Sequence, residues 1–134
     1  MTETTYTGMR LAAKTSLRLL LGALVFLGVL AVAGCHSYHV DTTVENRTGK
    51  PVKLLEVDYP SASFGTGQLD SGAVYPYQMQ FRNSGPLKVT YTTDYGHQVS
   101  IDGPHVAEKQ EGRLQIVLLP DGKAEFHPEL TPAP

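Results

Sequence analysis

Alternation of apolar and polar residues at every second position dominates the chain from residue 39 onward. This period is typical of strands that turn one face to a core and the other to solvent. It predicts strands at residues 39–45, 52–59, 75–82, 87–92, 98–102, 113–119 and 123–127, with Leu54 out of phase in the second. Clusters of Gly, Pro, Asn and Asp separate them and predict turns at residues 46–51 and 94–97 and a hairpin turn at 120–122. The pattern predicts an all-β domain of about seven short strands.

Strict alternation also indicates how the sheets are built. A sheet with one solvated face is usually antiparallel, whereas parallel sheets are covered on both faces. We therefore expect a small antiparallel β-sandwich. The in-phase apolar positions predict a core that contains Val57, Tyr77, Phe81, Val89, Leu114 and Ile116.

Two stretches resemble bacterial immunoglobulin-like modules. Residues 44–52 are similar to the first hairpin of these modules, and Leu-Asp-Ser-Gly at 69–72, ahead of an aromatic strand, is similar to their entry into a middle strand. The resemblance implies an immunoglobulin-like sandwich. It implies no particular activity, because this architecture carries many unrelated functions.

An uncharged run precedes this domain. Residues 19–34 contain only aliphatic, aromatic or small side chains, and Arg10, Lys14 and Arg18 come before them. This order is typical of a secretory signal. A transmembrane helix is the alternative, but the run of 16 residues is shorter than the roughly 20 that span a bilayer.

The end of the run, Val-Ala-Gly-Cys at 32–35, resembles the lipobox of bacterial lipoproteins. The resemblance implies cleavage between Gly34 and Cys35 and a diacylglyceryl group on the sulfur of Cys35, the chain's one cysteine. His36 stands where an Asp resembles an inner-membrane retention signal, so in a host with two membranes we expect the outer membrane, facing the periplasm. Met9 is an equal alternative to Met1 as the start, because Glu3 is atypical of a signal's basic region.

These segments divide the chain into four parts. We expect a signal peptide at 1–34, a lipidated N-terminus and short stalk at 35–38, a sandwich domain at 39–127 and a flexible Pro-rich tail at 128–134. From Cys35 onward there are 8 Lys and Arg against 12 Asp and Glu, a net charge of −4. This balance argues against nucleic acid as a partner and against membrane attachment through a basic patch.

Candidate chemistry in the domain is sparse. Five histidines occur, at His36, His39, His97, His105 and His127. His36 and His39 follow Cys35 closely, but an alkylated sulfur is no longer a thiolate ligand, and closed metal sites need three or four convergent groups. No serine lies in a Gly-x-Ser-x-Gly or Ser-x-x-Lys pattern, and no phosphate-binding loop is present. The sequence predicts no catalytic residue, no metal site and no cofactor.

Residues 60–72 form a connection that is long for a hairpin, with Phe64 among small residues. Phe64 either fills the end of the core or serves as an aromatic anchor for a partner. The leading hypothesis is a lipid-anchored, non-enzymatic interaction module that binds another envelope protein. The alternative is a periplasmic module that binds a small ligand or a metal through loop histidines, and an enzyme is the least supported reading.

Overall fold

The computed structural model describes Gly22 and residues 37–134. The predicted lipobox, Cys35 and His36, and the signal segment apart from Gly22, lie outside the described residues. Within residues 37–134 the chain forms eight strands and one short 3-10 turn: β1 (Val40–Asn46), β2 (Val52–Tyr59), β3 (Ala62–Leu69), β4 (Val74–Met79), β5 (Gly85–Thr92), β6 (Gln98–Val106), β7 (Gln110–Leu119), η1 (Pro120–Gly122) and β8 (Lys123–Pro132). No helix of this described part has the length and apolarity to cross a membrane.

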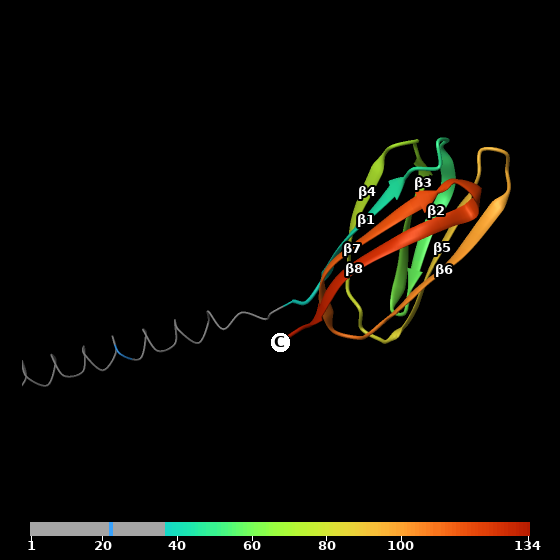
Figure 1. Cartoon of the computed structure of the whole chain (residues 1–134). Helices are drawn as coiled ribbons and strands as arrows, with labels where there is room; N and C mark the ends of the chain where they lie inside the picture. Colours follow the sequence, from blue (N-terminus) through green and yellow to red (C-terminus); the bar gives the residue numbers. More distant parts are fainter. Residues whose placement is uncertain (1–21, 23–36) are drawn as a thin grey trace, which may run out of the picture. The chain divides into compact units, whose positions relative to one another are not determined.

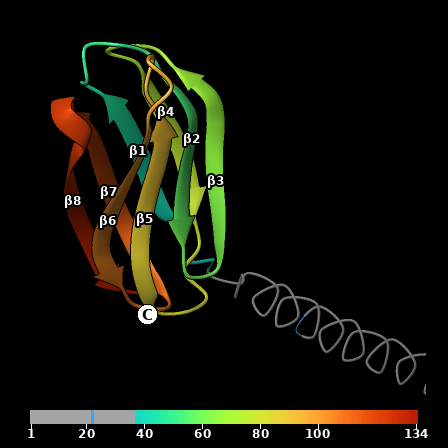
Figure 2. The ribbon, with the colours of Figure 1, turned by 90° about the vertical axis from the view of Figure 1, so that its right-hand side faces the viewer.

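The strands form two four-stranded sheets that pack face to face (Figures 1 and 2). The strand orders are β4-β1-β7-β8 and β3-β2-β5-β6. All neighbours are antiparallel except β1 and β7, which are parallel. The hairpins β2–β3, β5–β6 and β7–β8 stay within one sheet, and the other connections cross between sheets. The predicted small all-β sandwich is confirmed, with eight strands rather than seven.

The two ends of the sandwich carry different segments. Because β1 and β7 run in the same direction and β8 returns beside β7, the chain enters the domain at residues 37–40 and leaves it after Pro132 at the same end. We call this the proximal end. The turns at 47–51 and 93–97 and the η1 turn gather at the opposite end, which we call the distal end (Figure 1).

The core confirms most of the predicted positions. Val57, Phe81, Val89, Leu114 and Ile116 are all at most 1% exposed. Further buried side chains lie on the same inward faces: Val40, Val44, Val52, Leu55, Met79, Leu87 and Leu118.

The prediction for Tyr77 was wrong. Its side chain is 37% exposed, although it lies in phase with the buried Met79. Since β4 is an edge strand, only one flank of its inward face is covered by a neighbouring strand.

Leu54 is out of phase because β2 contains a bulge. The register between β2 and β5 shifts between Lys53 and Glu56, and Leu54 adopts a φ of 48° with 69% of its side chain exposed. Val52 and Leu55 can therefore both face the core. Leucine rarely adopts this left-handed conformation, so the bulge stores some backbone strain.

Residues 60–72, predicted as a long connection, contain β3. The strand pairs with β2 along Val52–Tyr59, and the turn before it is only two residues long. The sequence conceals it because its two buried side chains, Phe64 and Leu69, are separated by small polar and glycine residues. No two-residue apolar period results.

The Pro-rich tail is also shorter than predicted. Residues 128–132 continue β8, and the ladder with β7 extends to the pair Gln110–Pro132. Leu130 packs against the core. Proline is tolerated here because β8 is an edge strand, where a missing N–H can lie on the unpaired side.

Candidate binding surfaces

The four described histidines are spread over the domain. His97 lies in the β5–β6 turn and His105 near the far end of β6. His39 Nε2 is 3.9 Å from the Asp41 carboxylate, and His127 Nε2 is 3.2 Å from that of Glu125. Among the described residues no three or more His, Cys, Asp or Glu side chains are grouped to hold a metal ion. The structure does not bring His39, His97, His105 and His127 together into such a group.

Phe64 lies inside an aromatic cluster between the edge strands β3 and β4. Its ring stacks on Tyr77 with 4.1 Å between centroids and a 9° interplanar angle, and it lies 6.2 Å from Tyr75 and 6.4 Å from Tyr59. Phe64 is only 6% exposed. Burial is the main cause that raises the pKa of Tyr59, and the interaction with Tyr77 is the second cause. The reading of Phe64 as an exposed anchor on a loop is corrected: it packs in the core.

The β3 edge differs from the other three sheet edges. Proteins usually protect edge strands with proline or charge, because unpaired backbone groups invite another strand. The other edge strands carry such residues: Pro76 in β4, Asp102 and Pro104 in β6, and Lys123, Glu125, Pro128 and Glu129 in β8. β3 has neither proline nor charge between its first and last residues. Figure 2 shows it at the outer edge of its sheet.

The backbone of β3 is open to approach. Ser63, Gly65 and Gly67 are exposed, and none carries a side chain larger than a hydroxymethyl group. The Gly65 carbonyl accepts a hydrogen bond of 3.2 Å from the Tyr75 hydroxyl, so a side chain satisfies it. A Cβ at Gly65 would collide with the carbonyl oxygen of Leu55, which explains the glycine.

A shallow hollow of about 440 Å³ accompanies this edge. Leu54 and Glu56 of β2 and residues 63–67 of β3 line it. The exposed Leu54 side chain therefore stands beside a strand with almost no side-chain cover. The β3 edge, taken here as residues 62–69 with Leu54, combines unpaired backbone with one large apolar side chain.

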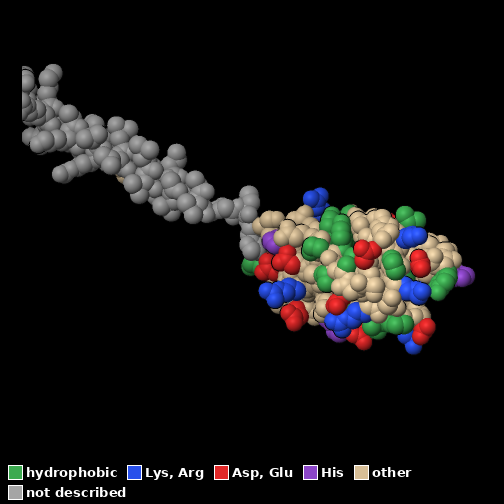
Figure 3. Space-filling view, turned by 90° about the horizontal axis from the view of Figure 1, so that it is seen from above, with side chains coloured by type: hydrophobic (Ala, Val, Ile, Leu, Met, Phe, Trp, Pro, Cys, Tyr) green, Lys and Arg blue, Asp and Glu red, His purple; other side chains and the backbone are tan. Residues whose placement is uncertain are grey.

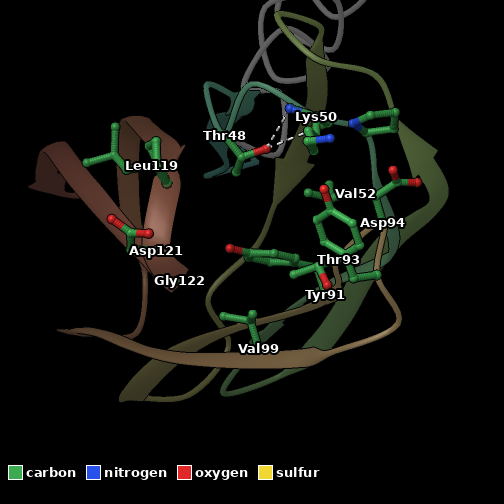
Figure 4. A pocket seen from close by; sticks show the side chains of 13 residues that line it. Thr48, Lys50, Val52, Tyr91, Thr93, Asp94, Val99, Leu119, Asp121 and Gly122 are labelled. Atoms are coloured by element: carbon green, nitrogen blue, oxygen red, sulfur yellow. Dashed lines mark hydrogen bonds between the residues drawn. The ribbon is translucent and has the colours of Figure 1, made fainter.

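A second cavity, the distal cleft, has a volume of about 450 Å³ (Figure 4). The β1–β2 turn, the β5–β6 turn and η1 form its walls, and Val52, Val99 and Leu119 supply apolar lining. Sequence reasoning identified all three segments as turns. It could not show that they meet.

Asn46 holds the first of these walls in shape. Its buried side chain donates from Nδ2 to the carbonyls of Lys50 (2.7 Å) and Leu69 (2.9 Å). Its Oδ1 accepts from the backbone N–H (3.0 Å) and the hydroxyl (2.7 Å) of Thr48. One fully buried amide thus ties the turn at 47–51 to the end of β3, as expected for a buried polar group whose hydrogen bonds are all made.

The η1 wall depends on left-handed backbone. Asp121 and Gly122 adopt φ values of 63° and 70°, which Asp and Gly tolerate better than other residues. This conformation lets β7 reverse directly into β8, and the prediction of a hairpin turn at 120–122 is confirmed.

Charged and aromatic groups surround the opening of the cleft. Lys50 Nζ lies 5.1 Å from the centroid of the Tyr95 ring, and Tyr95 is 74% exposed. A hydrogen bond with Tyr95 is the main cause that raises the pKa of Lys50. Asp94 and Asp121 bring two carboxylates to the same rim.

Tyr91 lies deeper in the cleft and is 2% exposed. Burial raises the pKa of its phenol. No hydrogen bond joins its hydroxyl to any other described residue, yet no fully buried side-chain oxygen or nitrogen of that part lacks a partner. The hydroxyl must therefore reach the open space of the cleft, and Figure 4 shows it directed there.

One face of the domain shows how its charges are distributed. In the face shown in Figure 3, acidic and basic side chains are interspersed with apolar ones.

Comparison with known proteins supports the fold and gives no information on function. No family model matches the chain, and no curated protein is similar to it. Among solved structures, the NMR structure of a protein from Eubacterium rectale aligns with a TM-score of 0.51 and 16% identity, covering 72% of this chain and 95% of the other. At that identity the likeness concerns the architecture alone, a small β-sandwich.

Proposed function

We propose that this chain is a lipid-anchored protein of the bacterial cell envelope. Its domain acts as a non-enzymatic interaction module that binds an extended segment of another envelope protein along β3. The lipobox resemblance at residues 32–35 supports the anchor. The observation that carries the binding mode is the β3 edge, which lacks the proline and charge that protect the other edges. Addition of a strand to an open sheet edge is a common mode of peptide recognition.

The anchor would set the orientation of the domain. Val40 lies five positions after Cys35, so the linking chain spans at most about 18 Å. A lipid on Cys35 would thus keep the proximal end near the membrane surface. β3 runs from the proximal to the distal end, so its edge would extend away from the membrane surface and its distal part would be open to a partner.

A different chain fits this edge better than a second copy. Antiparallel pairing of β3 with itself would place the two chain entries at opposite ends of the assembly. Two lipid anchors in the same membrane would need both chain entries on the same side, so this pairing is unfavourable. Because β3 carries no charge and Leu54 is exposed beside it, we expect a partner strand that is uncharged along the ladder and has one apolar residue in contact with Leu54.

The anchor is tested by mass spectrometry of membrane fractions. We expect a mature protein that begins at a diacylglyceryl-modified Cys35, and a Cys35→Ser variant that leaves the membrane. A mature chain that retains Met1 or Met9 contradicts the anchor.

Site-specific photocross-linking in membranes tests the interaction. A photoreactive residue at Ser63 is expected to capture one partner at an extended segment, whereas the same residue at Thr131, on the protected β8 edge, captures none. With the photoreactive residue moved to position 67, the substitution Ser63→Lys should abolish capture, because a charge on an edge strand opposes pairing. The same substitution should not lower the melting temperature, because Ser63 is exposed. Equal capture from both edges, or none from β3, contradicts the proposed binding mode.

A further inference from the structure

None of the residues that line the distal cleft belongs to the β3 edge, and nothing in the proposed function uses the cleft. We propose that this cleft is a binding site for a neutral saccharide. Its volume of about 450 Å³ falls within the range of roughly 300–1,000 Å³ that is usual for small-ligand sites.

Tyr91 is the reason to expect a ligand. A tyrosine that is 2% exposed normally directs its hydroxyl to a protein partner, but this hydroxyl reaches only the space of the cleft within the described structure. A hydroxyl on a bound molecule would supply the missing partner. The buried clamp of Asn46 keeps the facing wall in place, so the cleft is formed before a ligand arrives.

The charges of the lining select the class of ligand. The charged residues that line the cleft are Asp94, Asp121 and Lys50, so the lining has a net charge of −1, which opposes an anion. A cationic ligand would have to compete with the Lys50 ammonium, which already occupies one face of the Tyr95 ring. A neutral polyhydroxyl ring avoids both penalties.

The groups present match a sugar ring in kind. Its hydroxyls can donate to the two carboxylates and can accept from the Tyr91 hydroxyl and from Lys50. Its C–H face can contact apolar side chains such as Val99 and the open face of Tyr95, which is 74% exposed.

The test uses the full mature chain in detergent micelles and a matched set of trisaccharides. The set comprises neutral tri-N-acetylchitotriose, its cationic de-N-acetylated form and an anionic galacturonic acid trimer. We expect amide NMR shifts confined to the three turns of the cleft with the neutral trimer, and weaker or no shifts with the charged ones. Tyr91→Phe keeps the shape of the cleft and should weaken binding by roughly two- to tenfold, the range for one lost hydrogen bond. Its melting temperature should not change.

Three outcomes overturn the inference: no cleft shifts at about 10 mM neutral trimer, a concentration at which even millimolar affinity would be seen; tighter binding of a charged trimer; or equal affinity of the Tyr91→Phe variant. Ser63→Lys is the matched control, since it should leave saccharide binding unchanged. Failure of the saccharide site and failure of strand binding at β3 are therefore separate results.

Discussion

Removal of the Asn46 amide tests how the distal end is held together. The side chain is 0% exposed and makes four hydrogen bonds, two from Nδ2 and two to Oδ1. In Asn46→Ala the single proton of the Thr48 hydroxyl, for which Asn46 Oδ1 and the Lys50 carbonyl at 2.8 Å compete, can go to the Lys50 carbonyl, but the Leu69 carbonyl loses its side-chain donor. A buried group left without a partner costs about 1–3 kcal/mol, and each lost bond about 0.5–1.5 kcal/mol.

We therefore expect Asn46→Ala to lower the free energy of unfolding by about 2–4 kcal/mol in urea denaturation. For a domain of this size that corresponds to a fall in melting temperature of roughly 10–20 °C. Thr48→Val is the partial control. Of the four Asn46 bonds it removes only the one from the hydroxyl to Oδ1, together with the exposed contacts of that hydroxyl with the Lys50 backbone, and it should cost less.

Asn46→Asp adds a test by pH. It keeps the shape but turns a carboxylate oxygen toward two carbonyls that now accept from Nδ2. Folding should therefore raise the pKa of the introduced carboxyl above its usual value of about 3.9. The folded state then binds more protons than the unfolded state, so this variant should be most stable below about pH 4 and should lose stability as pH rises through the raised pKa. A loss below about 1 kcal/mol in Asn46→Ala, or an Asp variant indifferent to pH, would refute the argument.

Three further predictions concern single side chains. Phe64→Ala should lower the free energy of unfolding by about 3–5 kcal/mol in denaturant melts, since Phe64 is buried against Tyr77, and an unchanged melt would return Phe64 to the surface. Leu54→Gly should raise the free energy of unfolding by up to about 1 kcal/mol because it relieves a left-handed φ at an exposed site. Leu54→Ala keeps the strain and should not raise it. Equal melting temperatures of the two variants would show that the bulge is unstrained. Because burial raises the pKa of Tyr91, the folded domain holds a proton that the unfolded chain releases near pH 10. The stability that Tyr91 contributes should be complete below that pH and should be lost as pH rises through the folded pKa. Tyr91→Phe should remove this pH-dependent loss, which thermal melts at alkaline pH measure.

The sequence by itself determined the architecture wherever side chains alternate. Leu87, Val89 and Tyr91 are each buried and alternate with the polar Lys88, Thr90 and Thr92, so the two-residue period alone placed a strand and its inward face. The turns at 46–51 and 120–122 were equally legible, because Asn, Asp, Gly and Pro act on local backbone geometry.

Only the tertiary structure decided the rest. β3 contains glycine where neighbouring backbone comes close, and its status as an edge strand depends on pairing with a segment earlier in the chain. Tyr77 follows the core period yet is partly exposed, because position in the sheet order sets burial at an edge. The distal cleft joins turns about 25 to 70 residues apart, and local sequence carries no record of which turns share an end of the sandwich. Local physics specifies strands and turns, whereas the long-range packing of sheets specifies which side chains meet.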